Sequence, residues 1–331
     1  MFVSSVRAGA IRIIHHSLRQ FALAHLAPTC NNAGPSPMKL VILLIFLVMT
    51  NSGAAQQEPG REIDAGDCAS VANFTITPDK VAFPGPEGRT LYGWLYKPKG
   101  KGPFPAVVWN HGSELMSDPT LPFYRKDLAA FYVGKGFVFF TPHRTGHGMS
   151  RTAGESAATA ANKNCVGTNL DQVQLCKVRY HEESNLDTVS AVKWLQEQRF
   201  VKRKEVVVSG ASYGGIQTIL TSEKDLEVRA FVAFTPAAQS WPNVLLRERL
   251  MSALKKARKP VFLIQAEGDF SLGPYEVLGA YLNTKGGLNR AKLYPKFGST
   301  PQEAHATFSI RCKGIEIWGD DVAAFLKSAL K

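Results

Sequence analysis

The chain has 331 residues, of which 45% are hydrophobic and 20% are charged, a balance that excludes a disordered or fibrous protein and is typical of a globular one. The formal net charge is +12. The basic runs of the chain, such as Lys202–Lys204, are short and have no interleaved aromatic residues, so they do not indicate nucleic-acid binding.

The N-terminal region contains a segment typical of a secretory signal peptide. An apolar run, Leu40–Met49, follows the basic start at Met38, and small residues up to Ala54 supply a cleavage site. The run is too short to span a bilayer comfortably. We therefore expect residues 1–37 to be a mis-called extension, residues 38–55 to be removed, and the protein to be secreted or periplasmic. An unusually long leader or a single membrane anchor are the alternatives.

One folded domain is expected over residues 80–331, after a polar lead-in at residues 56–79. In its first half, strand-like apolar runs alternate with helix-compatible stretches. We predict strands over 80–83 and 90–96, joined as an antiparallel hairpin, further strands over 106–110 and 136–142, and helices over 124–132 and 178–198. The stretch 151–176 is rich in small and polar residues and is predicted to be a long loop. The apolar face of the second helix is expected to comprise Leu186, Val189, Val192 and Leu195.

The second half continues the same alternation. We predict strands over 205–208, 229–236, 260–265 and 291–294, and helices over 216–221, 244–257, 275–283 and 320–330. Strands that alternate with helices through the body of a chain indicate a mostly parallel, twisted sheet with helices on both faces. The predicted fold class is therefore α/β.

Cysteine usage agrees with export. Cys165 and Cys176 bracket a short polar stretch, and we expect them to form a disulfide bond. A bond between Cys68 and Cys312, which would tie the start of the chain to its end, is a weaker expectation. No group of Cys and His residues has the spacing of a metal site, so we expect no metal.

A nucleophile motif lies between the strand at 205–208 and the helix at 216–221. It reads Gly-x-Ser-x-Gly, with Ser212 at its centre and Gly210 and Gly214 on either side. A serine on so sharp a turn is exposed at the carboxyl end of the sheet, and the glycines let strand and helix pass closely. The backbone N–H of Tyr213 would then face a developing oxyanion. The alternative is a glycine-rich turn without chemistry.

A serine nucleophile needs a base and a carboxylate that orients the base. Asp269 follows the strand at 260–265 and fits the acid; the competing residue is Glu267, and a turn-forming role is the plainer interpretation of Asp269. His305 is the only histidine after Ser212 and precedes the last helix, where the base belongs. The order Ser212, Asp269, His305 predicts a catalytic triad.

A second oxyanion donor is expected in the segment after the strand at 106–110. We assign the Ser113 backbone N–H to this role, beside Tyr213. His111 is expected to form structural hydrogen bonds. Arg144 and His147 lie in a glycine-rich loop and are expected to fix it rather than to bind a metal, because no carboxylate or cysteine completes a cluster.

These motifs resemble those of the α/β-hydrolase superfamily, and within it the dienelactone hydrolase-like and prolyl oligopeptidase-like groups. The resemblance spans roughly 81–330 and rests on five segments, at 109–112, 142–148, 210–215, 268–269 and 303–305. It implies acyl transfer to water without a cofactor. Two departures bear on the substrate: Ser212 replaces the cysteine of dienelactone hydrolases, and too few residues precede the domain for the propeller of prolyl oligopeptidases.

The sequence thus predicts a secreted serine hydrolase that cleaves a carboxylic ester through an acyl-enzyme. One alternative is a serine peptidase acting on short peptides, with Glu182–Glu183 gripping a free N-terminus. Another is a non-catalytic binding protein. Residues 151–176 are expected to form a lid. Candidates for contact with a small ester or short-peptide substrate are His111, Glu114, Trp241 and Phe270, with core packing an equal alternative for the two aromatic residues.

Overall fold

The computed structural model describes residues 68–113 and 125–331. All of these residues belong to one compact unit. The expected signal peptide, the extension before it and Glu114 lie outside the described residues. No described helix combines the length and the hydropathy that a bilayer span requires.

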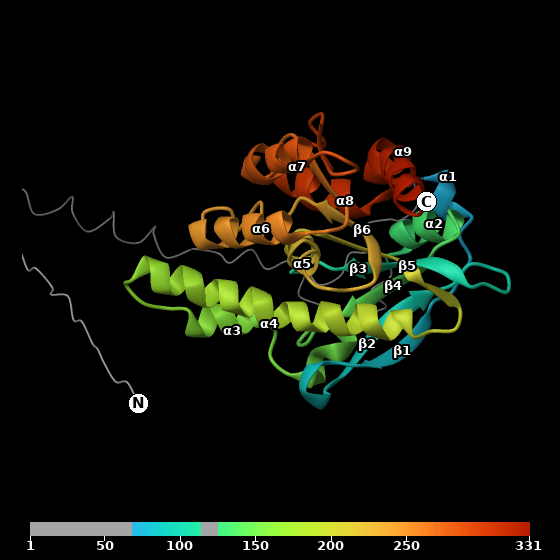
Figure 1. The fold of residues 1–331 in the computed structure, drawn as a ribbon, viewed down its shortest axis with the longest axis horizontal. Coiled ribbons are helices and arrows are strands. Elements are labelled where there is room, and N and C mark those ends of the chain that lie inside the picture. The colour runs from blue at the N-terminus through green and yellow to red at the C-terminus, as the bar shows by residue number, and fades with distance from the viewer. Residues whose placement is uncertain (1–67, 114–124) are drawn as a thin grey trace, which may run out of the picture. The chain divides into compact units, whose positions relative to one another are not determined.

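An eight-stranded sheet forms the centre of the described fold, in the order β1-β2-β4-β3-β5-β6-β7-β8 (Figure 1). The pairs β1–β2 and β2–β4 are antiparallel, and every other neighbouring pair is parallel. This confirms the predicted α/β fold and its N-terminal hairpin. The strands are β1 (Asp79–Pro84), β2 (Thr90–Tyr96), β3 (Phe104–Asn110), β4 (Val138–His143), β5 (Val201–Ala211), β6 (Val228–Phe234), β7 (Val261–Ala266) and β8 (Arg290–Tyr294).

Helices cover both faces of the sheet. One face packs against α4, α5 and α6, and the other against α2 and α9 (Figure 1). The helices are α1 (Ala69–Ala72), α2 (Lys126–Gly134), α3 (Ala157–Asn164), α4 (Leu170–Gln196), α5 (Tyr213–Thr221), α6 (Val244–Lys256), α7 (Ala280–Lys285), α8 (Phe308–Ile310) and α9 (Cys312–Ala329). Short helical turns are η1 (Pro86–Gly88), η2 (Gly148–Ala153), η3 (Pro274–Gly279) and η4 (Glu303–Thr307).

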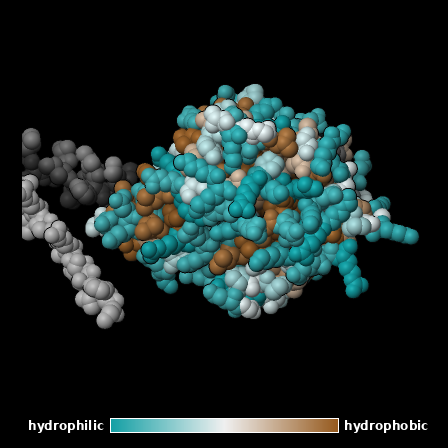
Figure 2. Space-filling view, in the orientation of Figure 1, coloured by the Kyte–Doolittle hydropathy of each residue, from teal (hydrophilic) through white to brown (hydrophobic). Residues whose placement is uncertain are grey.

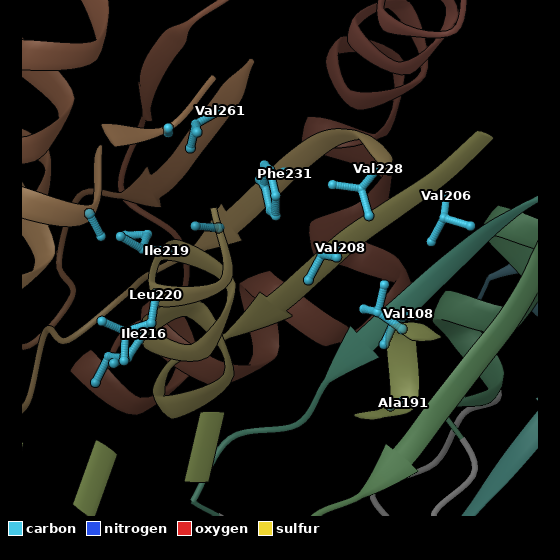
Figure 3. Packing of buried hydrophobic residues seen from close by; sticks show 14 of the residues in the cluster. Val108, Ala191, Val206, Val208, Ile216, Ile219, Leu220, Val228, Phe231 and Val261 are labelled. Carbon is cyan, nitrogen blue, oxygen red and sulfur yellow. The ribbon is translucent and has the colours of Figure 1, made fainter. Parts of the chain in front are cut away.

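The central strands divide their side chains between two hydrophobic cores. In β5, Val206 and Val208 face the core of α4, α5 and α6, whereas Val207 faces the opposite core. Figure 3 shows the first core, where Val208 and Phe231 of neighbouring strands lie near the α5 side chains. Successive residues of a strand point to opposite faces, so a strand buried on both faces is apolar throughout. This explains the continuous apolar runs of the sequence.

The stretch 151–176 is not the predicted long loop. Most of it forms helix α3 and the first turns of α4, which together make a helical hairpin. The Ser156 side chain caps α3 by accepting the Thr159 N–H at 3.2 Å, and the Asn169 side chain caps α4 by accepting the Gln172 N–H at 3.1 Å. Capped alanine-rich segments favour helix, which the count of small residues obscured.

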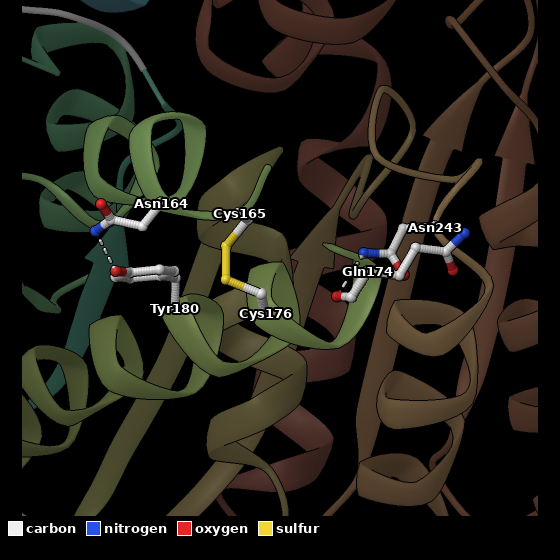
Figure 4. The surroundings of a disulfide bond; sticks show 6 residues. All are labelled: Asn164, Cys165, Gln174, Cys176, Tyr180 and Asn243. Atoms are coloured by element: carbon white, nitrogen blue, oxygen red, sulfur yellow. Dashed lines mark hydrogen bonds between the residues drawn. A yellow bond between two sulfur atoms is a disulfide. The ribbon is translucent and has the colours of Figure 1, made fainter. Parts of the chain in front are cut away.

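A disulfide bond between Cys165 and Cys176 joins the two helices of this hairpin (Figure 4). Nearby, the Asn164 amide donates to the Tyr180 hydroxyl at 2.7 Å. On the other side, the Asn243 amide donates to the Gln174 carbonyl at 3.3 Å, which links α4 to the start of α6. The predicted pairing is therefore present in the structure, and it holds a helical element in place of a loop.

The face of α4 toward the sheet is polar near its middle. Leu186, predicted to be part of an apolar face, is 48% exposed. In its place Asn185, Asp187 and Thr188 are buried. Asn185 donates to the Gln217 carbonyl at 3.0 Å, Thr188 donates to the Asn110 side chain at 2.8 Å, and Asp187 accepts the Thr145 N–H at 2.8 Å. Buried polar groups are tolerated when they are paired in this way.

The two ends of the described chain are joined covalently. Cys68, before α1, forms a disulfide bond with Cys312, the first residue of α9. The predicted last helix was too short, because it was expected to begin at Asp320. The Asp127 carboxylate on α2 accepts the Cys312 N–H at 2.9 Å and so caps α9 from a distance of 185 residues in sequence. No local sequence pattern contains such a cap.

Candidate active site

Ser212 occupies a strained backbone position between β5 and α5. Its φ and ψ angles are 58° and −119°, in a region that L-residues with a side chain rarely adopt. Its N–H donates to the Phe234 carbonyl at the end of β6, at 3.0 Å. This bond to a neighbouring strand helps to hold the turn, and strain of this kind is concentrated at functional sites. In the described part of the chain the Ser212 hydroxyl makes no hydrogen bond.

The flanking glycines are required because backbone atoms occupy the space beside them. A Cβ atom on Gly214 would lie 1.9 Å from the Asn110 carbonyl oxygen, and one on Gly210 would lie 2.6 Å from the same atom. Gly215 is similarly close, at 2.7 Å, to the Phe234 carbonyl oxygen. The start of α5 therefore lies directly against the ends of β3 and β6, as the motif predicts.

Asp269 and His305 form a buried pair. His305 Nδ1 lies 2.8 Å from Asp269 Oδ1, and both side chains are almost fully excluded from solvent. Asp269 follows β7, and His305 lies in the helical turn η4 after β8. The competing residue Glu267 is exposed. A carboxylate that accepts a hydrogen bond from Nδ1–H keeps the proton of the imidazole on Nδ1. In this tautomer Nε2 carries a lone pair and can accept a proton.

His305 Nε2 is buried and has no hydrogen-bond partner among the described residues. The ring of Phe270 lies edge-on to the imidazole, with 5.3 Å between the ring centroids. Buried polar atoms are rarely left without a partner, and those that are need an explanation. An imidazole nitrogen that carries a lone pair and is shielded by an aromatic ring is suited to receive a proton from a nearby hydroxyl.

The end of β6 connects the turn of Ser212 to the turn of His305. Phe234 accepts the Ser212 N–H, and the hydroxyl of the next residue, Thr235, lies 3.4 Å from that of Ser309. Ser309 in turn donates to the His305 carbonyl at 2.7 Å. The structure thus brings Asp269 and His305 into contact and places Ser212 at the same edge of the sheet. No hydrogen bond between Ser212 and His305 is present in the described residues.

The buried side chain of Arg144 touches both segments in which oxyanion donors are expected. Its guanidinium donates to the carbonyls of His111 and Gly112, each at 2.6 Å. The same group lies 4.9 Å from the centre of the Tyr213 ring. Arg144 therefore fixes the backbone that leads to Ser113 and packs against the residue after Ser212. Its role in holding the loop was expected, but its contact with Tyr213 was not.

His111 is a neutral, buried side chain in this arrangement. Its Nε2 accepts the Arg144 backbone N–H at 3.2 Å, which leaves the proton on Nδ1, 2.8 Å from the Gly112 carbonyl. Burial and the charge of Arg144 hold the pKa of His111 well below its usual value of 6.5. Burial likewise lowers the pKa of His143 to about 3 and that of His181 to about 4. These imidazoles remain uncharged at neutral pH.

The remaining sequence candidates have different surroundings. Trp241 is 8% exposed, packs against Gly273 and lies beneath the Arg247 guanidinium, 5.1 Å away, so most of its surface belongs to the core. Phe270 is 42% exposed beside His305. Glu182 forms an ion pair with Arg249 at 2.7 Å. Among the described residues, no group of three potential ligands could hold a metal ion.

One residue of the site was not predicted. Gln265, at the end of β7, donates through Nε2 to Asp269 Oδ2 at 2.7 Å. It is fully buried. The available signal was a polar side chain at the end of the apolar run Val261–Ile264, because a buried glutamine must find partners.

The family model of acetyl xylan esterases (AXE1) matches residues 70–246, just over half of the chain. The chain belongs to the acetyl xylan esterase family. This places it among the esterase-type serine hydrolases and confirms the resemblance to the α/β-hydrolase superfamily. The part of the chain that the family model matches includes Ser212 but ends before Asp269 and His305.

A curated relative of this family member is the polyketide transferase grgF of a Penicillium species. It is 25% identical over 179 residues, which are 54% of this chain and 51% of the relative. The chain thus spans about half the length of the curated relative that it matches.

Solved structures show the same fold at low identity. The Pyrococcus furiosus esterase Pf2001 has a TM-score of 0.54 and 18% identity, over 78% of this chain and 97% of that one. A candidate dienelactone hydrolase from Klebsiella pneumoniae has a TM-score of 0.55 and 14% identity, over 77% of this chain and 99% of that one. An acylaminoacyl peptidase from Pyrococcus horikoshii has a TM-score of 0.53 and 15% identity, over 76% of this chain and 41% of that one.

Proposed function

We propose that this member of the acetyl xylan esterase family hydrolyses a carboxylic ester with Ser212, His305 and Asp269. The observation that carries the proposal is the Asp269–His305 pair, whose second imidazole nitrogen is buried without a partner among the described residues, at the sheet edge that also carries Ser212. Neither a serine on a strained turn nor a histidine–aspartate pair suffices alone. Their presence at one edge, in the expected chain order, supports acyl transfer.

The chemistry proceeds in two steps. His305 Nε2 takes the Ser212 proton as Oγ attacks the acyl carbon, and the resulting imidazolium gives that proton to the departing alcohol. Water then attacks the acyl-enzyme, with His305 again accepting a proton and returning it to Ser212. Asp269 stays ionised and stabilises the imidazolium. The shielding of His305 and Asp269 from solvent strengthens this stabilisation.

The developing negative charge on the acyl oxygen requires donors that do not move. We assign the backbone N–H groups of Tyr213 and Ser113 to this role. Arg144 supports the assignment, because it bonds to the carbonyls of His111 and Gly112 and packs against the Tyr213 ring. Donors that are fixed before the reaction need no reorganisation during it.

The ester is proposed to bind between the Phe270 side chain and the α3–α4 hairpin. Ala157 and Ala158 at the start of α3 line a small cavity together with Ser113 and Tyr213. The hairpin thus lies beside the oxyanion segments, which supports a role in covering the site. Its far end exposes aliphatic side chains, with Val166 72% and Leu170 66% accessible, and hydrophobic colour gathers there in Figure 2.

The decisive experiment is labelling with a fluorophosphonate, which reacts with activated serine nucleophiles. We expect the full chain to be labelled once, at Ser212, and labelling to be lost in the variant Ser212→Ala. The matched control is Ser328→Ala, which removes an exposed serine on α9 and should be labelled like the natural protein. Absent labelling would contradict catalysis and favour a binding protein, whereas labelling that persists in Ser212→Ala would assign the nucleophile to another residue and contradict the role of Ser212.

The bond type requires a separate comparison. Initial rates on nitrophenyl esters of increasing acyl length, measured beside aminoacyl-proline amides, distinguish an esterase from a peptidase. We expect turnover of the esters alone, because Glu182, which would grip a free N-terminus, is already paired with Arg249. Faster cleavage of the amides would favour the peptidase instead.

Export is also proposed, because two disulfide bonds are stable chiefly in oxidising compartments. Mass spectrometry of the protein recovered from its host would locate the mature N-terminus. We expect it after Ala54 or Ala55, and an intact N-terminal segment would contradict cleavage.

A further inference from the structure

Gln265 has a fully buried side-chain amide in which every polar atom is paired. Nε2 donates to Asp269 Oδ2 at 2.7 Å and to the Ser271 carbonyl at 2.6 Å, while Oε1 accepts the Tyr275 N–H at 3.2 Å. Both partners of the nitrogen are acceptors, and the partner of the oxygen is a donor. The amide therefore has a single orientation that satisfies all three contacts.

The two oxygens of Asp269 have different donors. Oδ1 accepts hydrogen bonds from His305 Nδ1 at 2.8 Å and from the Phe270 N–H at 2.7 Å. Oδ2 accepts a hydrogen bond from Gln265 Nε2. Within the described residues, Gln265 is the one side chain that donates to Oδ2. Because the carboxylate is excluded from water, a lost donor leaves a buried anionic oxygen unpaired, and this is costly. The carboxylate would relieve that cost by rotating.

We propose that Gln265 is a positioning residue for the reaction: its amide holds the Asp269 carboxylate in the orientation in which it can fix the Nδ1 proton of His305. The proposal rests on the proposed function of Ser212, His305 and Asp269. Gln265 does not touch the substrate. It acts through Asp269, and it is itself held by the backbone of Ser271 and Tyr275, which precede and begin the next helical segment.

The variant Gln265→Met removes the donor and keeps a similar volume. We expect kcat to fall by roughly tenfold to a hundredfold with KM little changed, since a hydrogen bond to a charged group is lost at a site that does not bind substrate. Asp269→Asn should cause a larger fall. The matched control is Gln196→Met, because Gln196 is another buried glutamine but donates to the backbone carbonyls of Arg203 in β5 and of Glu227 just before β6.

The isosteric variant Gln265→Glu tests orientation without changing shape. Two carboxyl groups in hydrogen-bond contact cannot both ionise easily, so the pair should retain one proton. A protonated Glu still donates a hydrogen bond to Asp269, although its single O–H leaves the Ser271 carbonyl without its donor. At rising pH that proton is lost and activity should fall. The pH profile of kcat should therefore gain a descending limb, while Gln196→Glu keeps the natural profile. The titratable groups that face position 265 are Asp269 and, through it, His305.

These measurements separate the possible failures. If the natural protein is not labelled at Ser212, the proposed function fails and the role of Gln265 fails with it. If it is labelled and Asp269→Asn is impaired, but both Gln265 variants match the natural kcat and pH profile, only the role of Gln265 is overturned. Loss of folding in both variants, measured by thermal unfolding, would assign Gln265 to stability alone and would also overturn it.

Discussion

At the scale of single residues, burial distinguishes the two acids that the sequence offered. Asp269 is buried and accepts three hydrogen bonds, one of them shared with the imidazole of His305. Glu267, two residues earlier, is exposed. A carboxylate can stabilise an imidazolium strongly only where water does not screen the charges. The geometry therefore supports Asp269 as the acid.

Gly214 offers a sharp residue-scale test of the turn. In Gly214→Ala, the added Cβ would lie 1.9 Å from the Asn110 carbonyl oxygen, and that backbone cannot yield easily. We expect a loss of about 3 kcal/mol or more in the free energy of unfolding, or failure to fold. The control is Gly134→Ala at the end of α2, where no atom lies within 4 Å, and it should change stability by less than about 1 kcal/mol. Urea unfolding of both variants checks this, and equal stabilities would contradict the close approach.

At the scale of elements, the cross-linked α3–α4 hairpin is where expectation and structure diverged most. Alanine, glycine and asparagine in residues 151–176 suggested a loop, yet the segment is helical between caps at Ser156 and Asn169. The capping residues were present in the sequence, but the prediction of a loop was based on the many small and polar residues of the segment. The polar face of α4 was missed for another reason, since the partners of Asn185 and Thr188 lie on distant elements. Periodicity of apolar residues cannot locate a buried hydrogen-bond network.

The two disulfide bonds should stabilise the protein to different extents. In the chain-entropy description, closing the 11-residue separation of Cys165–Cys176 contributes about 3 kcal/mol, and closing the 244-residue separation of Cys68–Cys312 about 5 kcal/mol. We therefore expect Cys68→Ser with Cys312→Ser to lower the unfolding free energy more than Cys165→Ser with Cys176→Ser. Urea unfolding of the two double variants measures this, and the opposite order would show that native contacts outweigh loop length.

At the scale of the whole molecule, the buried histidines couple stability to pH. Burial holds the pKa of His143 at about 3 and that of His181 at about 4, whereas the unfolded chain restores a value near 6.5. Below that value the unfolded state binds protons that the folded state does not, so stability falls as the pH drops. The fall should begin near pH 6.5 and continue to about pH 3, where His143 also becomes protonated in the folded state.

Unfolding free energies at a series of pH values test this. His181→Gln should reduce the slope between roughly pH 6.5 and 4.5. Glu223→Gln serves as the control. Although burial opposes it, hydrogen bonds from Arg249 lower the pKa of Glu223 below 4.5, so this variant should lower the stability at neutral pH and change the slope of the curve only at more acidic pH. An unfolding free energy that does not change between roughly pH 6.5 and 4.5 would contradict the claim that these histidines are buried and neutral.

The overall architecture was the most predictable property of the chain. Runs such as Val206–Val208 are buried on both faces, so local composition alone identifies them as central strands. The order of Ser212, Asp269 and His305 followed from the same fold. Local sequence could not supply contacts between distant segments, such as Asp127 at the start of α9 and Arg144 against Tyr213. The bond from Gln265 to Asp269 is local and was missed although a polar residue at the end of an apolar run was a signal for it.

The bond between Cys68 and Cys312 closes nearly the whole folded unit into a covalent ring. A protease that nicks any surface loop between these residues would add one water molecule and release nothing. The nicked protein would migrate as one species on a non-reducing gel and separate into fragments only after thiol reduction. A first cut would then leave Ser212 and the later Asp269 and His305 on one molecule that can remain assembled.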